Sequence, residues 1–355
     1  MLNKLKTIGL YLLRVPALFY QIIIAGRNFA YDLLPGLSKA VDLPVICVGN
    51  ITTGGTGKTP MAAFLAGYFQ SIGLRVAILS RGYGRQDKNS QQVITDNSKK
   101  EVLSAEKIGD EALMLHQQLS DVTLVLDADR VRGAETIYRE DQADIILMDD
   151  GFQHRRLRRN FNLIMIDSQR LFANRQLLPA GPLREPLSSL KRADVVIFNK
   201  FDQRHPRFYS QTAEILNHVA AHKLFCASYR YNKFTSLTGC ATKNLTEMQA
   251  LGPFYAVSGL ANNDYFFTQL KASGLKLENS RSFKDHHIYT DRDFTDLKTI
   301  CRGRALLTTA KDADKLKTLI SEKDKSFLQQ IWVAEIELKI EDEARFLKLL
   351  TKFLP

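Results

Sequence analysis

The chain from residue 43 to residue 200 alternates short apolar runs with segments of helical length. The apolar runs are nearly continuous and rich in valine, isoleucine and leucine, which is typical of parallel strands covered on both faces. Between them, residues 60–73 and 110–119 carry apolar side chains at helical spacing. This pattern predicts an α/β fold, with an open parallel sheet flanked by helices. The predicted strands are residues 44–50, 75–81, 122–128, 144–150, 162–167 and 194–200.

The pattern loosens after residue 200 and predicts a second, smaller α/β domain. Residues 253–274 and 304–320 each have the pattern of a strand, a turn and a helix, and residues 330–340 that of a further strand. The segment 177–190 contains three prolines and a glycine, so it is the best candidate for a connector between the domains.

The first 34 residues are apolar, with basic side chains interspersed. The longest uncharged run, residues 15–26, is shorter than the ~20 residues that span a bilayer. No small-residue cleavage site of a secretory signal follows. Two interpretations stay open: a helix lying in a membrane interface, or a helix packed into the core. The predicted domains are a membrane-interface helix over residues 1–35, a larger α/β core over 36–190 and a smaller C-terminal α/β domain over 191–355.

The composition is that of a globular protein with a basic surface. Of the 355 residues, 45% are apolar and 25% are charged, as is ordinary for a globular protein. The length suggests about two domains of ~100–200 residues each. The net charge of +11 favours an anionic partner: nucleic acid, an acidic membrane surface or a phosphorylated substrate. The four cysteines form no C-x-x-C pair, which argues against a metal knuckle or a disulfide framework.

The segment GNITTGGTGKTP, residues 49–60, matches the end of the phosphate-binding loop G-x-x-x-x-G-K-[ST] between a strand and a helix. Thr52 replaces the usual first glycine. The remaining glycines permit a tight loop whose amides surround phosphate oxygens, and the following helix adds the field of its N-terminus. Lys58 can reach the outer phosphates, and Thr59 can bind Mg²⁺ through its hydroxyl. The predicted nucleotide-binding residues are Thr53, Gly54, Gly55, Thr56, Gly57, Lys58 and Thr59.

Aspartates stand at two positions where phosphate-transfer chemistry would need them. Asp149 and Asp150 end an apolar strand, as expected of carboxylates that position Mg²⁺, although they could also cap the next turn. Asp110 begins a predicted helix. It is either an ordinary N-cap or the carboxylate that accepts a proton from an acceptor hydroxyl.

Three further motifs are less specific. In FKDHHIYTDRDF, residues 283–294, adjacent histidines on a strand point to opposite faces, so one acid/base or orienting histidine is favoured over a metal site. In FNKFD, residues 198–202, the N-x-x-D spacing resembles the guanine-selecting motif of GTPases, or a strand end before a polar turn. The arginines of HRRLRRNF, residues 154–161, predict a solvated face, because the aromatic stacking pattern of single-strand binders is absent.

Taken together, these residues resemble the lipid A 4′-kinase family (tetraacyldisaccharide 4′-kinase). The resemblance covers nearly the whole chain and is carried in order by VGNITTGGTGKTP, LSRGYGR, GDEALML, DDGFQHRRL, LPAGPLREP, VSGLAN, FKDHHIY and LLTTAKDADKL. It implies a peripheral enzyme on the cytoplasmic face of the inner membrane. Such an enzyme moves the γ-phosphate of ATP, with Mg²⁺, to the 4′-hydroxyl of a lipid A disaccharide 1-phosphate.

The resemblance also implies residue roles. Lys58 and Thr59 hold phosphates and Mg²⁺, and Asp149 and Asp150 serve the metal. Asp110 matches the catalytic base of the family, and His286 of the D-H-H motif matches the partner of that base. Two departures are an alanine in GDEALML where many relatives have proline, and the NKFD ending of its strand. The implied substrate contacts are Tyr83, Arg85, Gln153, His154, Arg184 and Glu185.

The residues also support a rival class, a membrane-associated phosphate-loop switch ATPase or GTPase. The GG-x-GKT core and NKFD favour it. Against it, Thr53 stands where partitioning-type ATPases carry a lysine, and a switch does not need a second domain bearing residues 285–287. A nucleic-acid-binding ATPase rests on charge alone. We therefore expect an anionic membrane surface and a lipid substrate as partners, with no nucleic acid and no obligate protein partner.

Overall fold

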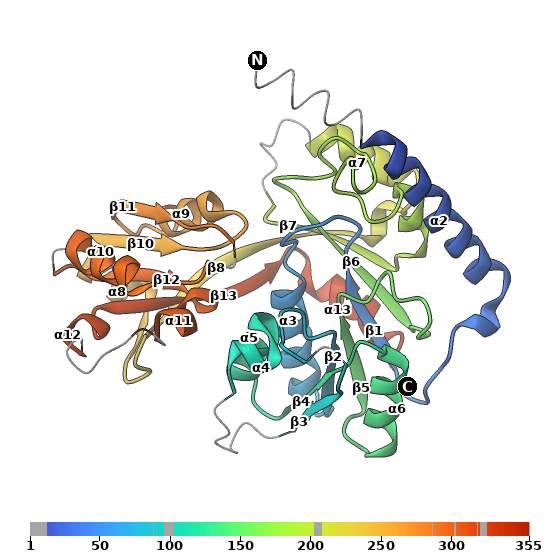
Figure 1. The fold of residues 1–355 in the computed structure, drawn as a ribbon, viewed down its shortest axis with the longest axis horizontal. Helices are drawn as coiled ribbons and strands as arrows, with labels where there is room; N and C mark the ends of the chain where they lie inside the picture. The colour runs from blue at the N-terminus through green and yellow to red at the C-terminus, as the bar shows by residue number, and fades with distance from the viewer. Residues whose placement is uncertain are drawn as a thin grey trace. The chain divides into compact units, whose positions relative to one another are not determined.

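The computed structural model describes residues 13–87, 89–95, 103–201, 208–285, 287–301, 303–317, 319 and 325–354. The chain forms two compact units, Met1–Ser228 with Ile340–Pro355 and Tyr229–Lys339. Two strands carry the chain across the boundary between the units (Figure 1). These are β8 (Leu224–Ser236) on the way out and β13 (Ile331–Ile340) on the way back.

The first unit is built on a mainly parallel sheet with the strand order β8-β7-β6-β1-β5-β2-β4-β3. The central strand β1 pairs in parallel with β5 and β6, and only β3, at the edge, runs antiparallel to its neighbour β4. Every residue of β1, β4, β5 and β7 is buried, which explains their unbroken apolar runs. The parallel sheet predicted from the sequence is confirmed. The strands are β1 (Val45–Gly49), β2 (Val76–Ser80), β3 (Gln92–Ile94), β4 (Val122–Leu126), β5 (Ile145–Asp149), β6 (Phe161–Asp167) and β7 (Val195–Asn199).

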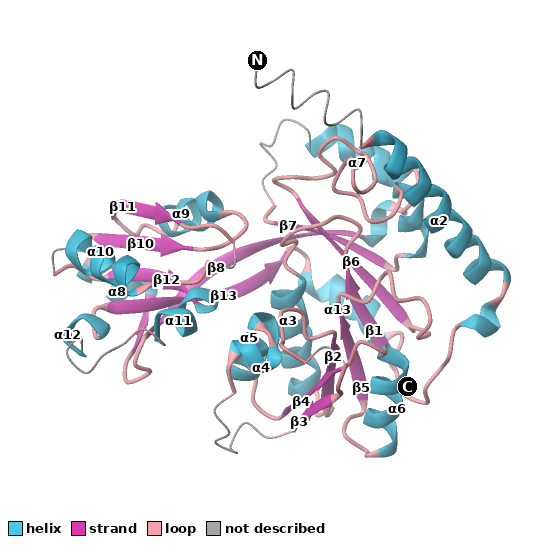
Figure 2. Cartoon of the chain, viewed as in Figure 1, coloured by secondary structure: helices cyan, strands magenta, loops and turns pink. Residues whose placement is uncertain are grey.

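Helices cover both faces of this sheet (Figure 2). On one face, α6 places Val131, Ala134 and Ile137 in the same core cluster as Cys47 and Met148 of the sheet. On the other face, α3 packs with the C-terminal helix α13, which returns to the first unit from the end of the chain. The helices are α2 (Arg14–Leu33), α3 (Lys58–Ser71), α4 (Ala105–Ile108), α5 (Asp110–Gln118), α6 (Arg130–Arg139), α7 (Phe208–Leu216), α13 (Glu343–Thr351) and the 3₁₀ turns η1 (Pro35–Leu37), η2 (Leu187–Arg192) and η3 (Ala221–Lys223).

The second unit is a smaller α/β unit, as the sequence predicts. Its strand order is β11-β10-β12-β13-β8, and β10, β11, β12 and β13 run parallel, whereas the short β9 pairs antiparallel with β8. The remaining elements are β9 (Thr242–Asn244), β10 (Phe254–Ser258), β11 (Leu277–Ser282), β12 (Leu306–Thr309), α8 (Leu245–Leu251), α9 (Asn263–Ala272), α10 (Asp291–Cys301), α11 (Ala310–Lys317) and α12 (Lys325–Leu328).

The division between the units differs from the boundary predicted at residue 190. β7 pairs with β6 and the start of β8 pairs with β7, so the chain up to residue 228 completes the first sheet. The proline-rich segment 177–190 is not a connector, because its backbone bonds to the strand end before the phosphate loop: Thr53 N donates to Pro182 O (2.8 Å) and Arg184 N to Ile51 O (2.8 Å). Residues 1–12 of the predicted N-terminal helix lie outside the described residues.

Replacing Phe346 tests whether the C-terminal helix belongs to the first unit. Phe346 of α13 is fully buried, with its ring centroid 6.4 Å from that of Phe64 and 5.5 Å from that of Phe225. We expect Phe346→Ala to lower the free energy of unfolding by about 3–5 kcal/mol, measured by denaturant titration, because it leaves a cavity in the core. The exposed Lys348→Ala on the same helix serves as the control. Equal stability of both variants would make α13 a loosely attached tail.

Candidate active site

The loop between β1 and α3 has the conformation of a phosphate-binding loop. Gly54 and Gly57 adopt φ angles of 99° and 89°, a region that side-chain-bearing residues rarely enter. Gly57 caps α3 without a side-chain hydrogen bond, so the first amides of the helix are available to an anion. Within the loop, Thr56 N donates to Gly54 O (3.0 Å), and Asn50 Nδ2 donates to Thr56 Oγ1 (3.0 Å). Lys58 follows as the first residue of the helix.

The carbonyl groups of the loop are held by the end of β7. Asn199 Nδ2 donates to Thr56 O (2.9 Å), and Lys200 Nζ donates to Gly55 O (3.1 Å). Lys200 also forms a buried ion pair with Asp167 at the end of β6 (2.6 Å). The asparagine and lysine of the FNKFD motif therefore brace the phosphate loop. The sequence pattern of this motif suggested selection of the guanine base or a strand end before a polar turn. Nothing in the pattern indicated hydrogen bonds to the phosphate loop.

The two aspartates at the end of β5 lie in different electrostatic environments. Asp149 is buried, and burial raises its pKa to about 7, with a further increase from the carboxylate of Glu111. Asp150 lies 3.5 Å from Lys58 Nζ, and both of its oxygens accept hydrogen bonds from Arg184 Nη1 (2.9 and 3.0 Å). Burial raises the pKa of Asp150, but Lys58 and Arg184 outweigh this effect and hold it below the ordinary value.

These residues fit a magnesium ion. Asp149 Oδ1 is buried and has no hydrogen-bond partner within the described part of the chain, so a cation could satisfy it. Thr59 is buried in the first turn of α3, beside Lys58. Over the described ranges, no three acidic, histidine or cysteine side chains gather as a complete metal cage. Mg²⁺ binds through one or two carboxylates and completes its shell with water and phosphate oxygens.

The loop after β2 and the start of α5 lie against each other. Gly109 has φ 92°, and a Cβ atom at this position would come within 2.4 Å of Tyr83 O. Asp110 is half-buried as the first residue of α5, and Tyr83 is 75% exposed. The backbone contact thus brings the start of the helix that carries the predicted base against the loop that carries a predicted substrate contact.

Other predicted substrate contacts face the protein itself. Arg85 is only 1% exposed, and its guanidinium donates to Leu126 O (3.0 Å) and Ser90 O (2.8 Å), so it braces the loop after β2. Glu185 is fully buried. The resemblance implied a substrate contact for both, but neither presents a surface at which a substrate could dock.

Gln153 and His154 follow the acidic pair. Gln153 Nε2 donates to Asn50 O (2.9 Å), and its Oε1 lies 3.5 Å from Arg184 Nη1. Burial, reinforced by the charge of Arg130, lowers the pKa of His154 to about 4. His154 is therefore neutral at physiological pH and can act there as a hydrogen-bonding group but not as a cation.

The arginine run after the acidic pair is only in part the solvated face that the sequence predicts, because Arg156 and Arg158 are exposed whereas Arg155 and Arg159 are half-buried. Arg155 forms an ion pair with Asp32 of α2 (2.6 Å). Arg156 pairs with Asp129 at the start of α6 (2.8 Å). Arg159 donates to the carbonyl of His154, in its own loop (3.0 Å). The ion pairs of Arg155 and Arg156 are structural, and their partners, Asp32 and Asp129, are too distant in sequence to have been foreseen.

His286, the predicted partner of the base, lies outside the described residues. Its neighbours in the second unit are held by ion pairs. His287 Nε2 lies 3.1 Å from Asp293 Oδ2, and Asp285 pairs with Lys311 (2.7 Å). The expectation that the two histidines differ in role therefore stays a prediction, with His287 in a structural position.

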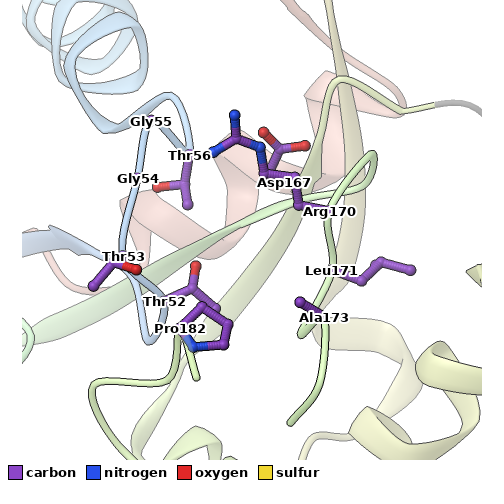
Figure 3. A pocket seen from close by; sticks show the side chains of 10 residues that line it. All are labelled: Thr52, Thr53, Gly54, Gly55, Thr56, Asp167, Arg170, Leu171, Ala173 and Pro182. Atoms are coloured by element: carbon purple, nitrogen blue, oxygen red, sulfur yellow. The ribbon is translucent and has the colours of Figure 1, made fainter. Parts of the chain in front are cut away.

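A cavity of about 310 Å³ adjoins the phosphate loop (Figure 3). The loop forms one wall, and the opposite wall is formed by the end of β6, with Asp167, and the segment after it, with Arg170. The cavity therefore offers space beside the first half of the phosphate loop. The lining residues are Thr52, Thr53, Gly54, Gly55, Thr56, Asp167, Arg170, Leu171, Ala173 and Pro182.

The parallel sheet, the phosphate loop and the acidic strand end define a phosphate-loop nucleotide-binding protein of the α/β class. A family model described as tetraacyldisaccharide-1-P 4′-kinase matches residues 10–355. The chain belongs to this family, as the resemblance implied.

Known relatives match over most of their length. The tetraacyldisaccharide 4′-kinase of Geobacter sulfurreducens is 32% identical over 349 residues, which cover 96% of this chain and 93% of the relative. The enzyme of the same name from Chlorobium luteolum is 34% identical over 328 residues, 86% of each chain. A crystal structure of LpxK from Aquifex aeolicus in complex with ATP superposes with a TM-score of 0.74 at 28% identity, covering all of both chains.

Because Lys200 Nζ donates a hydrogen bond to the Gly55 carbonyl, replacing Lys200 should weaken nucleotide binding. Without its amine the Gly55 carbonyl loses a charge-assisted hydrogen bond, so Lys200→Ala should weaken ATP and GTP binding by the same factor, about tenfold or more. Calorimetric titration of both nucleotides measures this, with the exposed Lys191→Ala as control. A selective change in GTP affinity would instead assign Lys200 to the base. Asp202, the last residue of the motif, lies outside the described residues.

Proposed function

We propose that this protein transfers the γ-phosphate of ATP to the 4′-hydroxyl of a lipid A disaccharide 1-phosphate. The main support is the combination of a braced phosphate loop with an acidic pair in a chain of the tetraacyldisaccharide-1-P 4′-kinase family. The ATP complex of the Aquifex aeolicus relative supports ATP as the donor. The rival class, a phosphate-loop switch, would pass the phosphate to water.

On the donor side, the loop amides and Lys58 would hold the polyphosphate. Thr59, Asp149 and Asp150 would hold Mg²⁺, which neutralises charge that builds up on the phosphoryl group during transfer. Lys58 Nζ lies 3.5 Å from Asp150 Oδ1, so this ion pair holds the lysine at the start of α3 beside the acidic pair. Positioning and charge neutralisation are the main requirements of phosphoryl transfer, and these residues meet both.

On the acceptor side, Asp110 would accept the proton of the 4′-hydroxyl. The hydroxyl oxygen attacks the γ-phosphorus, the bond to the β,γ-bridging oxygen breaks, and ADP leaves with that electron pair. His286 would assist Asp110. The proposed contacts for the sugar or its phosphate remain Tyr83, Gln153, His154 and Arg184. The exposure of Tyr83 on the loop beside Asp110 supports its part in this set.

We further propose that α2 lies on the anionic cytoplasmic surface of the inner membrane. One face of α2 packs into the protein through Ala17 and Ile24, whereas large apolar side chains remain exposed on the rest. A contiguous exposed apolar patch is typical of a membrane or partner interface, and the net charge of +11 suits anionic lipids. No helix among the described residues has the length and apolarity to cross a bilayer. The exposed apolar residues of α2 are Val15, Leu18, Phe19, Ile22, Ile23, Phe29 and Leu33.

Incubation with γ-labelled ATP and a detergent-dispersed lipid A disaccharide 1-phosphate tests the proposed reaction. The unmodified chain should label the lipid, and Lys58→Ala and Asp110→Ala should each lower transfer by at least about a hundredfold. Asp110→Ala should still bind ATP, because Asp110 acts on the acceptor. The exposed Asp42→Ala is the matched control. Label released only as free phosphate would favour the switch, and full transfer by Asp110→Ala would remove it as the base.

Polar substitutions on α2 test membrane binding. Replacing Phe19, Ile22 and Ile23 together by glutamine should lower binding to anionic liposomes by about tenfold or more, because each buried apolar side chain contributes ~1.5–3 kcal/mol. Co-sedimentation measures the bound fraction. The control replaces two apolar residues exposed elsewhere, Ile72 and Leu216, by glutamine. Equal binding of the two variants would show that the apolar face of α2 serves another purpose.

A further inference from the structure

We infer that α2 has a second task besides membrane binding: it positions Arg184, and through Arg184 the carboxylate of Asp150, by a buried polar clamp centred on Glu185. The inference rests on the proposed function, because it assigns Asp150 to the donor site. Arg184 and the α2 residues of the clamp are positioning residues in this scheme.

Glu185 is the centre of the clamp. It is 0% exposed, and its carboxylate accepts hydrogen bonds from four side chains. Two donors belong to α2, Arg27 (3.4 Å) and Asn28 (2.8 Å). The other two belong to η2, Ser189 (2.9 Å) and Arg192. A buried carboxylate is tolerated only when its oxygens are paired, so the position of α2 and that of Glu185 depend on each other.

Arg184, the preceding residue, connects this clamp to the site. Its backbone is fixed on both sides: the amide donates to Ile51 O (2.8 Å), and the carbonyl accepts from Tyr20 Oη of α2 (2.9 Å). Its guanidinium holds both oxygens of Asp150. One residue thus joins α2, the strand end before the phosphate loop and the acidic pair.

A second group of contacts ties α2 to the loop after Asp150. Arg155 donates to the backbone carbonyl of Asn28 (3.0 Å), pairs with Asp32 (2.6 Å) and lies over the ring of Tyr31 (5.2 Å to its centroid). The polar contacts of α2 therefore reach both segments that position Asp150, the one that follows it and the one that carries Arg184.

Two simpler explanations account for less. A substrate-binding role for Glu185 does not fit a side chain with no exposed surface and four donors. A pure anchor requires the exposed apolar face of α2 but does not require Tyr20, Arg27 and Asn28 to bind the two segments beside Asp150. The polar contacts are explained if the helix also sets the geometry of the donor site.

Asn28→Ala tests the inference without weakening the helix, since alanine favours helix formation. We expect the variant to bind Mg²⁺–ATP about tenfold more weakly in calorimetric titration, because Arg184 and Asp150 lose their alignment. We also expect kcat to fall about tenfold with detergent-dispersed acceptor, at an unchanged KM for the lipid. Binding to anionic liposomes should not change. The exposed Gln21→Ala, one residue along from Tyr20 on α2, is the matched control.

Tyr20→Phe distinguishes a loss of positioning at the donor site from a loss of fold stability. It removes only the hydroxyl that donates to Arg184 O, so the thermal midpoint should hold while Mg²⁺–ATP affinity falls by about two- to fivefold. If Asn28→Ala and Tyr20→Phe both bind Mg²⁺–ATP like Gln21→Ala, the inference is overturned and α2 is an anchor only. If the unmodified chain labels no lipid, the proposed function fails, whereas the affinity measurements still decide on the clamp.

Discussion

The shape of the phosphate loop depends on where its carbonyl groups find partners. A loop that turns its amides toward an anion must turn its carbonyls the other way, and buried carbonyls need donors. Asn199 and Lys200 supply these donors to Thr56 and Gly55, and Asp167 balances the buried charge of Lys200. The ends of β6 and β7, the strands on this side of β1, deliver these side chains to the loop.

Next to the loop, the surroundings of two adjacent aspartates shift their pKa values in opposite directions. Burial raises the pKa of Asp149 to about 7, whereas Lys58 and Arg184 hold the pKa of Asp150 below its usual value. A raised pKa means that the charged form of Asp149 is poorly solvated, so a bound cation would be favoured there. Asp150, in contrast, is already paired with two cationic side chains, Lys58 and Arg184. Perturbed carboxylates of this kind are typical of functional sites.

The sequence predicted what depends on local pattern. The buried strands, the glycine-rich loop and the strand-end aspartates could be predicted because each is encoded within about ten neighbouring residues. The braces and clamps could not, since Glu185 meets Asn28 across 157 positions and Arg184 meets Asp150 across 34. The segment 177–190 misled for a related reason: its prolines and glycine are typical of a linker, but its backbone bonds to the strand end before the loop.

The core-helix interpretation of the N-terminal segment describes one face of α2, and a membrane interface is the role proposed for the other. Ala17 and Ile24 of the helix are buried, whereas Phe19 and Ile23 are exposed, so the helix is apolar on two faces. The polar residues of the helix contribute to neither apolar face. Tyr20, Arg27 and Asn28 bind the segment that carries Arg184 and Glu185, which a membrane anchor alone would not need. An acceptor whose acyl chains stay in the bilayer must be met at the interface, and a helix that both lies there and fixes the donor site would place the two reactants in one frame.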